Sequence, residues 1–187
     1  VQNISKHFRG AFTGEWAARM ASECGYGWTL IGHSERRTLY GETDDDCVEK
    51  FIKAQWAGLR VIYCIGETMK ERDDGVTDEV NRRMLENVVP LVRDWEHFAI
   101  AYEPVWSIGL DRTATPEQAQ ETQSAIRAYV RSKCGDLAAD KVRILYGGSE
   151  ISKNCDELIA MPDIDGFLVG GNALSPKFLE IIESCNH

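Results

Sequence analysis

Short apolar segments alternate along this chain with longer segments in which apolar residues recur at helical spacing. The apolar segments are rich in β-branched and aromatic residues and lack strict alternation, which is typical of parallel strands buried on both faces. Five of them run into polar or glycine-rich sequence, at residues 28–35, 61–67, 98–106, 142–149 and 166–171. This alternation predicts an α/β fold built on a parallel sheet.

The segments between the strands carry signals for the start of a helix. Thr43 precedes three aspartates, and acidic residues in the first turn stabilise a helix N-terminus. Thr115 precedes a proline and has a glutamine three positions later, which predicts a helix opened by a capping box. In the helix after Thr43, the apolar spacing predicts that Val48, Phe51 and Ile52 face inward, with Trp56 as a further candidate.

Two ways of closing the predicted sheet are compatible with this pattern. One is an open sheet with helices on both faces, and the other is part of an eight-stranded barrel; periodicity does not separate them. Glycine-rich turns follow the last two strands, and a phosphate site after two successive late strands is typical of barrels. No Gly-x-Gly-x-x-Gly motif follows an early strand, which weakens a dinucleotide-binding interpretation. The turns therefore favour the barrel.

The composition excludes several classes of function. The chain has 187 residues, of which 43% are hydrophobic and 27% charged, and its formal net charge is −9. This acidic balance argues against a basic surface for nucleic acid or for anionic membranes. No apolar run approaches the roughly 18 residues of a membrane span. We therefore expect neither nucleic acid nor a membrane as a partner.

The cysteines and histidines are scattered along the chain. The six cysteines form no Cys-x-x-Cys pair, which fits free thiols in a reducing compartment and predicts a cytoplasmic protein. The four histidines do not cluster, and no spacing typical of metal ligands is present. Residues 1–3 have the pattern of a strand end, so we expect further sequence upstream.

Two side chains at strand ends have the chemistry of a proton-transfer site. His33 follows an apolar strand, where it could be an electrophile or proton relay, or only a hydrogen-bonded structural residue. Glu103 directly follows a buried strand, where a carboxylate is costly unless it is paired or used. It could be a general base with a pKa raised by partial burial, or the partner of a basic residue nearby. A helix beginning at Ser34 would favour a neutral imidazole at His33.

Two glycine pairs and one long loop could hold a ligand. Gly147 and Gly148, like Gly170 and Gly171, precede a possible helix, so their backbone N–H groups could bind an anion; tight turn geometry is the alternative. Residues 104–114 are longer than a minimal strand–helix loop and apolar in their first half. This segment could close over a ligand as a lid, or pack as a surface loop.

A second glutamate occupies a similar position one strand earlier. Glu67 could be catalytic, but we favour a structural role because Arg36, Arg37 and Arg72 are available as ion-pair partners. Cys64, three residues before it, is interpreted as a small core residue rather than a nucleophile, since no histidine neighbours it in the sequence.

These strand ends together resemble triosephosphate isomerase. The matching segments are residues 32–37 (Gly-His-Ser-Glu-Arg-Arg), 64–67 (Cys-Ile-Gly-Glu), 101–106 (Ala-Tyr-Glu-Pro-Val-Trp), 146–149 (Tyr-Gly-Gly-Ser) and 165–171 (Asp-Gly-Phe-Leu-Val-Gly-Gly). They occur in the family's order and approximate spacing, and the Tyr-Glu-Pro-Val-Trp stretch is highly specific. The resemblance covers the whole chain. It implies a single (β/α) barrel domain over residues 1–187, a partial eight-stranded TIM barrel that lacks its first two β-α units and is incomplete at its N-terminus.

The resemblance also implies an activity and its residues. The enzyme would interconvert glyceraldehyde 3-phosphate and dihydroxyacetone phosphate in glycolysis and gluconeogenesis, without a metal or an organic cofactor. Glu103 would move a proton between C1 and C2 while neutral His33 polarises the carbonyl, a pairing for which this enzyme is itself the standard example. The substrate phosphate would be held by backbone N–H groups of Gly109, Ser149, Gly170 and Gly171. A homodimer is implied, with Thr13 in the loop that contacts the partner.

Three departures from the family pattern carry expectations of their own. The asparagine and lysine that follow the family's first strand have no counterpart here, so we expect the isolated chain to fold poorly and to be nearly inactive. The lid reads Gly-Leu-Asp-Arg at residues 109–112, where the family has Gly-Thr-Gly-Lys, and Glu150 adds an acid near the expected phosphate site. The alternatives are a degenerate, non-catalytic relative that binds phosphorylated metabolites, and a barrel enzyme for another phosphorylated substrate.

Overall fold

The computed structural model describes residues 1–108, 114–148 and 151–186, and within them the chain forms one five-stranded sheet. Its strands lie side by side in sequence order: β1 (Trp28–Ile31), β2 (Arg60–Ile65), β3 (Phe98–Tyr102), β4 (Arg143–Tyr146) and β5 (Gly166–Phe167). Every neighbouring pair is parallel, so the predicted α/β fold with a parallel sheet is confirmed. The sequential order has no switch point of a doubly wound sheet and is consistent with part of a TIM barrel.

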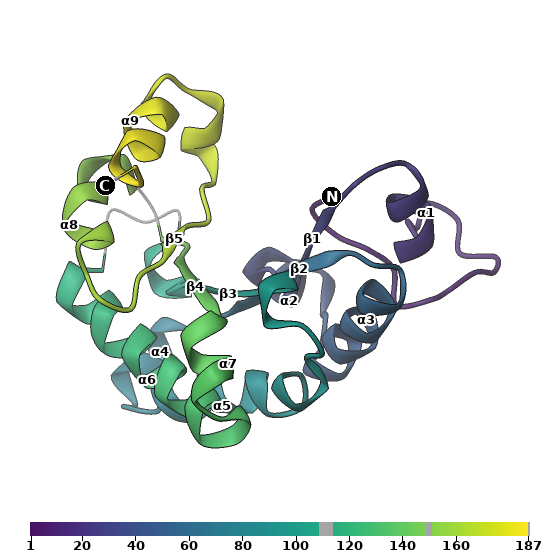
Figure 1. Ribbon diagram of the computed structural model, residues 1–187, viewed down its shortest axis with the longest axis horizontal. Coiled ribbons are helices and arrows are strands. Elements are labelled where there is room, and N and C mark those ends of the chain that lie inside the picture. The colour runs from purple at the N-terminus through teal and green to yellow at the C-terminus, as the bar shows by residue number, and fades with distance from the viewer. Residues whose placement is uncertain (109–113, 149–150, 187) are drawn as a thin grey trace.

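Helices connect the strands, and α3 to α7 gather along one side of the sheet (Figure 1). Parallel strands require such crossovers, because consecutive strands run in the same direction. The helices in the described part of the chain are α1 (Ala18–Glu23), α2 (Ser34–Tyr40), α3 (Asp44–Trp56), α4 (Met69–Asp73), α5 (Thr77–Glu86), α6 (Pro116–Cys134), α7 (Asp136–Lys141), α8 (Cys155–Ile159) and α9 (Lys177–Ser184). Short 3-10 turns complete the connections: η1 (Val89–Leu91), η2 (Trp95–His97), η3 (Val105–Ser107), η4 (Ile151–Lys153) and η5 (Gly171–Leu174). None of these helices is long and apolar enough to cross a membrane.

The two faces of the sheet differ in how completely they are covered. Successive side chains of a strand point to opposite faces. On one face, Ile31, Tyr63, Ile100 and Ile144 form a row across four strands, and each has at most 1% of its surface exposed. The opposite face carries half-buried side chains, which include Leu30, Ile62 and Leu145. The main core therefore lies between the sheet and the helices.

Threonine caps fix the start of two helices, as the sequence predicts. Thr43 caps α3 and Thr115 caps α6, and each forms a capping box with the third residue of its helix. The inward face of α3 includes Phe51, which is 1% exposed. The prediction that Ile52 and Trp56 also face inward is wrong, because they are 36% and 68% exposed. The buried stripe follows the spacing of positions 47, 51 and 54 instead.

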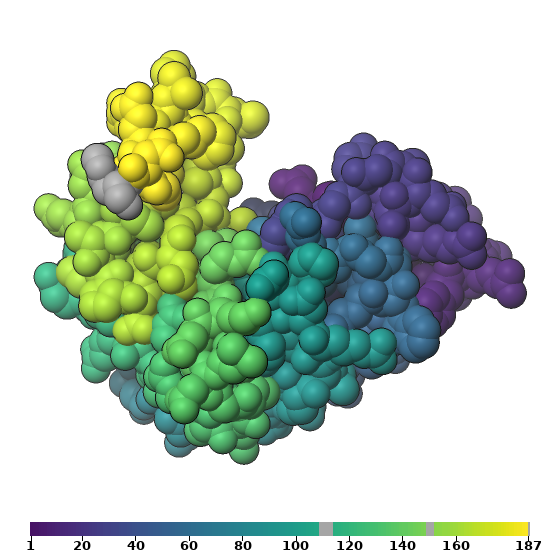
Figure 2. Space-filling model, in the orientation of Figure 1, coloured from purple at the N-terminus to yellow at the C-terminus, as the bar shows by residue number. Residues whose placement is uncertain are grey.

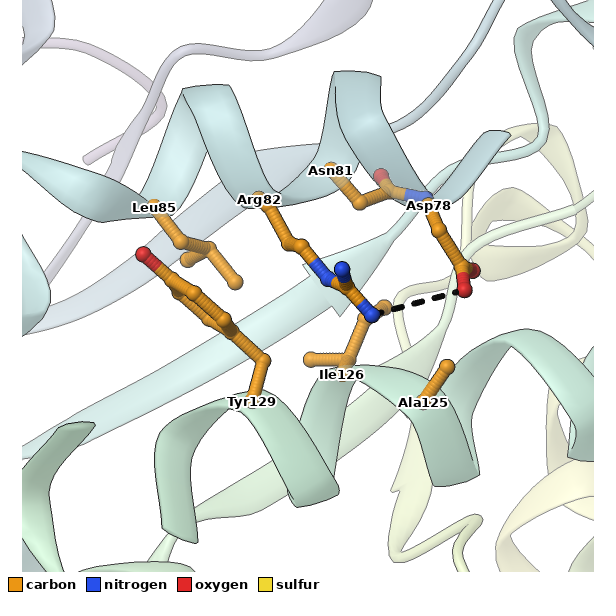
Figure 3. A pocket seen from close by; sticks show the side chains of 7 residues that line it. All are labelled: Asp78, Asn81, Arg82, Leu85, Ala125, Ile126 and Tyr129. Atoms are coloured by element: carbon orange, nitrogen blue, oxygen red, sulfur yellow. Dashed lines mark ion pairs between the residues drawn. The ribbon is translucent and has the colours of Figure 1, made fainter. Parts of the chain in front are cut away.

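A small cavity lies between α5 and α6. Figure 3 shows Asn81 and Leu85 of α5 on one side of it, Ile126 of α6 on the other, and the ion pair between Arg82 and Asp78 at its edge. Its volume is about 10 Å³. Asn81 is 2% exposed, and neither polar atom of its amide has a hydrogen-bond partner among the described residues. A buried amide without a partner lowers the stability of a fold.

Candidate active site

Glu103 occupies the first position after β3. Strand alternation places it on the same face as Ala99 and Ala101, whose small side chains leave room for the carboxylate. The N–H of Glu103 donates to the carbonyl of Ile65 over 2.7 Å, which extends the pairing with β2. At Gly66 a Cβ would lie 1.7 Å from the Glu103 carbonyl oxygen, so only glycine allows this approach. The glutamate is 3% exposed and is therefore held in a defined position.

His33 is the N-cap residue of α2. Gly32, just before it, has φ of +75°, a conformation that glycine adopts without strain. The N–H of Glu35 donates to Nδ1 of His33 over 3.3 Å. A ring nitrogen that accepts a hydrogen bond carries no proton, so the proton of the neutral imidazole is assigned to Nε2. Nε2 lies 3.0 Å from Oε1 of Glu103 and is the donor of that contact.

Opposing influences act on the pKa of His33. The hydrogen bond to the Glu103 carboxylate raises this pKa, and burial of the ring opposes the increase. The N–H of Glu35 also favours the neutral ring, because it loses its acceptor when Nδ1 is protonated. When the carboxylate leaves Nε2, the largest influence toward the imidazolium is lost. The neutral ring is thus the form that the helix start supports.

The second oxygen of Glu103 is held by the backbone of α2. The N–H of Ser34 donates to Oε2 over 3.0 Å. Sequence reasoning missed this contact, because every residue except proline offers the same N–H at that position. The only signal is the place of Ser34 at the start of the predicted helix. Both carboxylate oxygens therefore accept from the two residues that follow Gly32.

A cleft of about 660 Å³ opens beside these side chains. Its lining includes His33, Glu103 and both predicted glycine pairs, which are Gly147 with Gly148 and Gly170 with Gly171. Residues from both ends of the chain line it, and Figure 2 shows the surface hollowed between the N-terminal and C-terminal parts. The ends of β1, β3, β4 and β5 therefore converge on one cleft, as expected for parallel strands around a ligand site.

The remaining predicted site residues lie elsewhere. Gly109 and Ser149, expected to bind phosphate, lie outside the described residues. Thr13 lies in an exposed loop before α1 and does not line the cleft. Sequence reasoning gave no role to the side chains of the lining residues Asn3 and Asn172, since an isolated asparagine carries no distinctive pattern. The described part of the predicted site thus reduces to a histidine, a glutamate and two glycine turns.

Glu67 does not line the cleft and is fully buried. Its Oε1 accepts from Arg72 Nη1 at 3.0 Å, from the Tyr102 hydroxyl at 3.0 Å and from Trp106 Nε1 at 2.9 Å. Of the three arginines available in the sequence, Arg72 is its partner. The other two pair with different acids, Arg36 with Glu42 and Arg37 with Asp44. These contacts support a structural role.

Cys64 also has the environment of a core residue. It is fully buried, and burial raises the pKa of its thiol well above the ordinary value. A thiol in this state is protonated at neutral pH and is a poor nucleophile. Among the described residues, no group of three or more His, Cys, Asp or Glu side chains is placed to hold a metal ion.

The geometry of the cleft agrees with a comparison to known protein families. A family model described as triosephosphate isomerase matches residues 1–185 of the 187-residue chain. The match includes the strand ends that contribute His33, Glu103 and the glycine turns to the cleft. The chain belongs to the triosephosphate isomerase family, whose enzymes interconvert glyceraldehyde 3-phosphate and dihydroxyacetone phosphate.

Proposed function

We propose that Glu103 and His33 perform the proton transfer of triose-phosphate isomerisation in this protein. Glu103 takes a proton from one carbon of the substrate and returns it to the neighbouring carbon. His33 donates its Nε2 hydrogen to the carbonyl oxygen and stabilises the negative charge of the enediolate. The observation that carries this proposal is the 3.0 Å contact between Glu103 Oε1 and His33 Nε2 in the cleft. A substrate between them would meet a base at carbon and a donor at oxygen.

The contacts of Glu103 suit a base that must change partners. Its oxygens accept from His33 Nε2 and from the N–H of Ser34, and with His33 in the proposed neutral form neither donor carries a charge. Hydrogen bonds to neutral donors are weaker than those to a cation, so the carboxylate can leave them for a substrate C–H. The low exposure of Glu103 also keeps bulk water away from the reacting atoms.

The phosphate of the triose phosphate binds at the glycine turns. Gly170 and Gly171 line the cleft, and a Cβ at either position would meet no atom within 4 Å. The open space beside these glycines leaves room for a bulky anion close to the backbone. Gly109 and Ser149, which lie outside the described residues, complete this phosphate site.

Val1 pairs with β1 in the manner of a further parallel strand. Val1 donates its N–H to the Trp28 carbonyl over 2.7 Å and accepts from the Leu30 N–H over 3.1 Å, which is the pattern of a parallel ladder. A strand that ends at Val1 would therefore extend the sheet beyond β1. Ile62 and Leu145, half-buried here, would face the interior of the closed barrel. We expect the 187-residue chain alone to be nearly inactive.

The active form is a homodimer that contacts its partner through the loop around Thr13. Three aromatic side chains in this region are well exposed, Phe8 at 59%, Phe12 at 41% and Trp16 at 43%. Exposed aromatic residues are enriched at protein interfaces. Light scattering on the complete protein checks this assembly, and a monomer at micromolar concentration would contradict it. The reaction places the enzyme in glycolysis and gluconeogenesis in the cytoplasm.

The test of the proton transfer is isomerisation in D₂O, because the base exchanges the proton that it carries with solvent. Nuclear magnetic resonance follows the conversion of glyceraldehyde 3-phosphate and the deuterium that enters the product. The complete protein should show both, and Glu103→Gln should lose both by a factor of about 10²–10⁴. The matched control is Glu86→Gln on an exposed position of α5, which should change neither. Unchanged exchange in Glu103→Gln would exclude Glu103 as the base. The 187-residue chain, run beside the complete protein, tests the need for the upstream units.

A further inference from the structure

One side-chain hydrogen bond joins the two glycine turns that border the cleft. Asn172 follows the second turn, within η5, and Ser152 lies in η4, which follows the first turn. The Nδ2 group of Asn172 donates to Oγ of Ser152 over 3.4 Å. Asn172 is half-buried and lines the cleft together with Gly170 and Gly171. The contact therefore connects segments that follow β4 and β5 respectively.

Two further hydrogen bonds among the described residues lie within the second turn. The N–H of Ala173 donates to the carbonyl of Gly170 over 2.9 Å, and the Ser175 hydroxyl donates to the carbonyl of Asn172 over 3.1 Å. These bonds shape one turn but do not fix its distance from the other. Helix α9 packs against both η4 and η5 and supports them from behind. In the described part of the chain, the bond from Asn172 to Ser152 is a polar link between the segments that follow the two turns.

We propose that Asn172 is a positioning residue for the phosphate of the substrate. By holding Ser152, it keeps the turns after β4 and β5 at the spacing at which backbone N–H groups from both reach one phosphate. The proposal rests on the proposed function and adds to it a side chain outside the glycine motifs. A phosphate needs several donors at once, so a small change in the spacing of the turns weakens all of them.

A double-mutant cycle on the complete, active isomerase tests this link. The variants are Asn172→Ala, Ser152→Ala and the pair together, and the probes are glyceraldehyde 3-phosphate as substrate and inorganic phosphate as competitive inhibitor. Each single change should raise KM and the phosphate inhibition constant about three- to tenfold, the size expected for one lost hydrogen bond. The double variant should be no weaker than the single ones, because both remove the same bond. The value of kcat should stay within about twofold, because the proton-transfer residues are untouched.

Two further variants separate positioning from a general effect on folding. Ser175→Ala removes a hydroxyl whose bond stays inside the second turn, and it should leave KM and phosphate inhibition unchanged. Ser152→Thr keeps the hydroxyl that accepts from Asn172 and should restore the unmodified values. If Ser152→Ala does not fold, Ser152→Thr compared with Ser152→Val still decides the question.

Several results would overturn the proposal. Additive effects in the double variant, normal phosphate inhibition in Ser152→Ala, or a fall in kcat with unchanged KM would each show that the bond does not position the phosphate. Failure of the proposed function has a different signature. In that case Glu103→Gln would keep its turnover, or inorganic phosphate would not inhibit the unmodified enzyme. Absence of phosphate inhibition would also overturn the proposed positioning role of Asn172.

Discussion

Glu67 and Glu103 follow neighbouring strands of the same sheet, yet their surroundings differ in kind. One oxygen of Glu67 accepts from a guanidinium and two aromatic donors, and the carboxylate lies outside the cleft. The two oxygens of Glu103 accept from the His33 ring and a backbone N–H inside the cleft. A carboxylate bound to a permanent cation is fixed in place, whereas one bound to an imidazole and a backbone N–H can exchange these donors for a substrate. The donors, rather than the position on the strand, decide the role.

The cluster around Glu67 is rigid for further reasons. The guanidinium of Arg72 lies 4.7 Å from the centre of the Trp106 ring, so the cation contacts both the carboxylate and one of its other donors. Burial, together with the Glu67 carboxylate, raises the pKa of Tyr102 well above its ordinary value. The tyrosine hydroxyl therefore remains a donor across the physiological pH range. Among the described residues, Glu103 is held by the His33 ring and the Ser34 N–H, without a guanidinium.

The largest expected effect separates the two glutamates by activity. Glu103→Gln should lower kcat by a factor of about 10²–10⁴, because an amide cannot accept the substrate proton. Glu67→Gln should lower kcat by less than about tenfold, since Glu67 does not line the cleft. Steady-state kinetics on the complete enzyme measures both. Losses of equal size would show that Glu67 takes part in the chemistry.

For the free energy of unfolding, we expect the opposite order, with the larger loss in the Glu67 variant. Glu67→Gln leaves Arg72 without its anion, and we expect a loss of about 2 kcal/mol, less than the ~3–5 kcal/mol of a fully buried pair. The reduction reflects the Arg72 side chain, which is 22% exposed. Glu103→Gln removes a buried charge but keeps only one acceptor oxygen for the two donors, so we expect it to cost less stability than Glu67→Gln. Urea unfolding of both variants beside the unmodified enzyme gives the comparison, and a larger loss in Glu103→Gln would reverse our assignment.

The sequence identified the strands and both glutamates but could not assign their donors. Alternation and capping residues are local patterns, so the parallel sheet and the starts of α3 and α6 could be predicted. The choice of Arg72 over Arg36 and Arg37 depends on how helices pack above the sheet, which no local pattern encodes. The same limit explains the wrong prediction for Trp56, whose exposure depends on the exact angle of the helix face.

The convergence of His33 and the glycine turns on one cleft could be predicted from the sequence for a different reason. Strand ends of a parallel sheet meet at one edge, so polar residues at those ends converge whatever the details of packing. The N–H of Ser34 and the amide of Asn172 could not be found in this way. The first is a backbone group that every sequence has, and the second acts through a contact between turns whose spacing only the fold defines.

Asn81 is a buried polar residue that differs from both glutamates. In the described part of the chain, it is not paired with a cation, as Glu67 is, and it does not line the cleft, as Glu103 does. Its amide lacks partners among the described residues and borders the cavity between α5 and α6 (Figure 3). Asn81→Val should therefore stabilise the protein by about 1 kcal/mol, because an unpaired buried amide is replaced by an apolar group that fills the space. Thermal unfolding measures the gain, with Asn87→Val on the exposed end of the same helix as control. Destabilisation by Asn81→Val alone would mean that the amide has a partner in solution.

The smallest expected effect is on the titration of His33. The Glu103 carboxylate raises the pKa of His33, so Glu103→Gln should lower it, whereas Glu67→Gln should leave it unchanged. A pKa raised in the folded state stabilises the protein fully below the ordinary value of about 6.5, and this contribution is lost as the pH rises through the raised value. Nuclear magnetic resonance of the imidazole nitrogens follows the titration in each variant, and it also reports whether Nε2 holds the proton of the neutral ring. An unchanged pKa in Glu103→Gln would mean that the histidine and the glutamate are not in contact in solution, and the distinction between the two glutamates would then rest on their other donors alone.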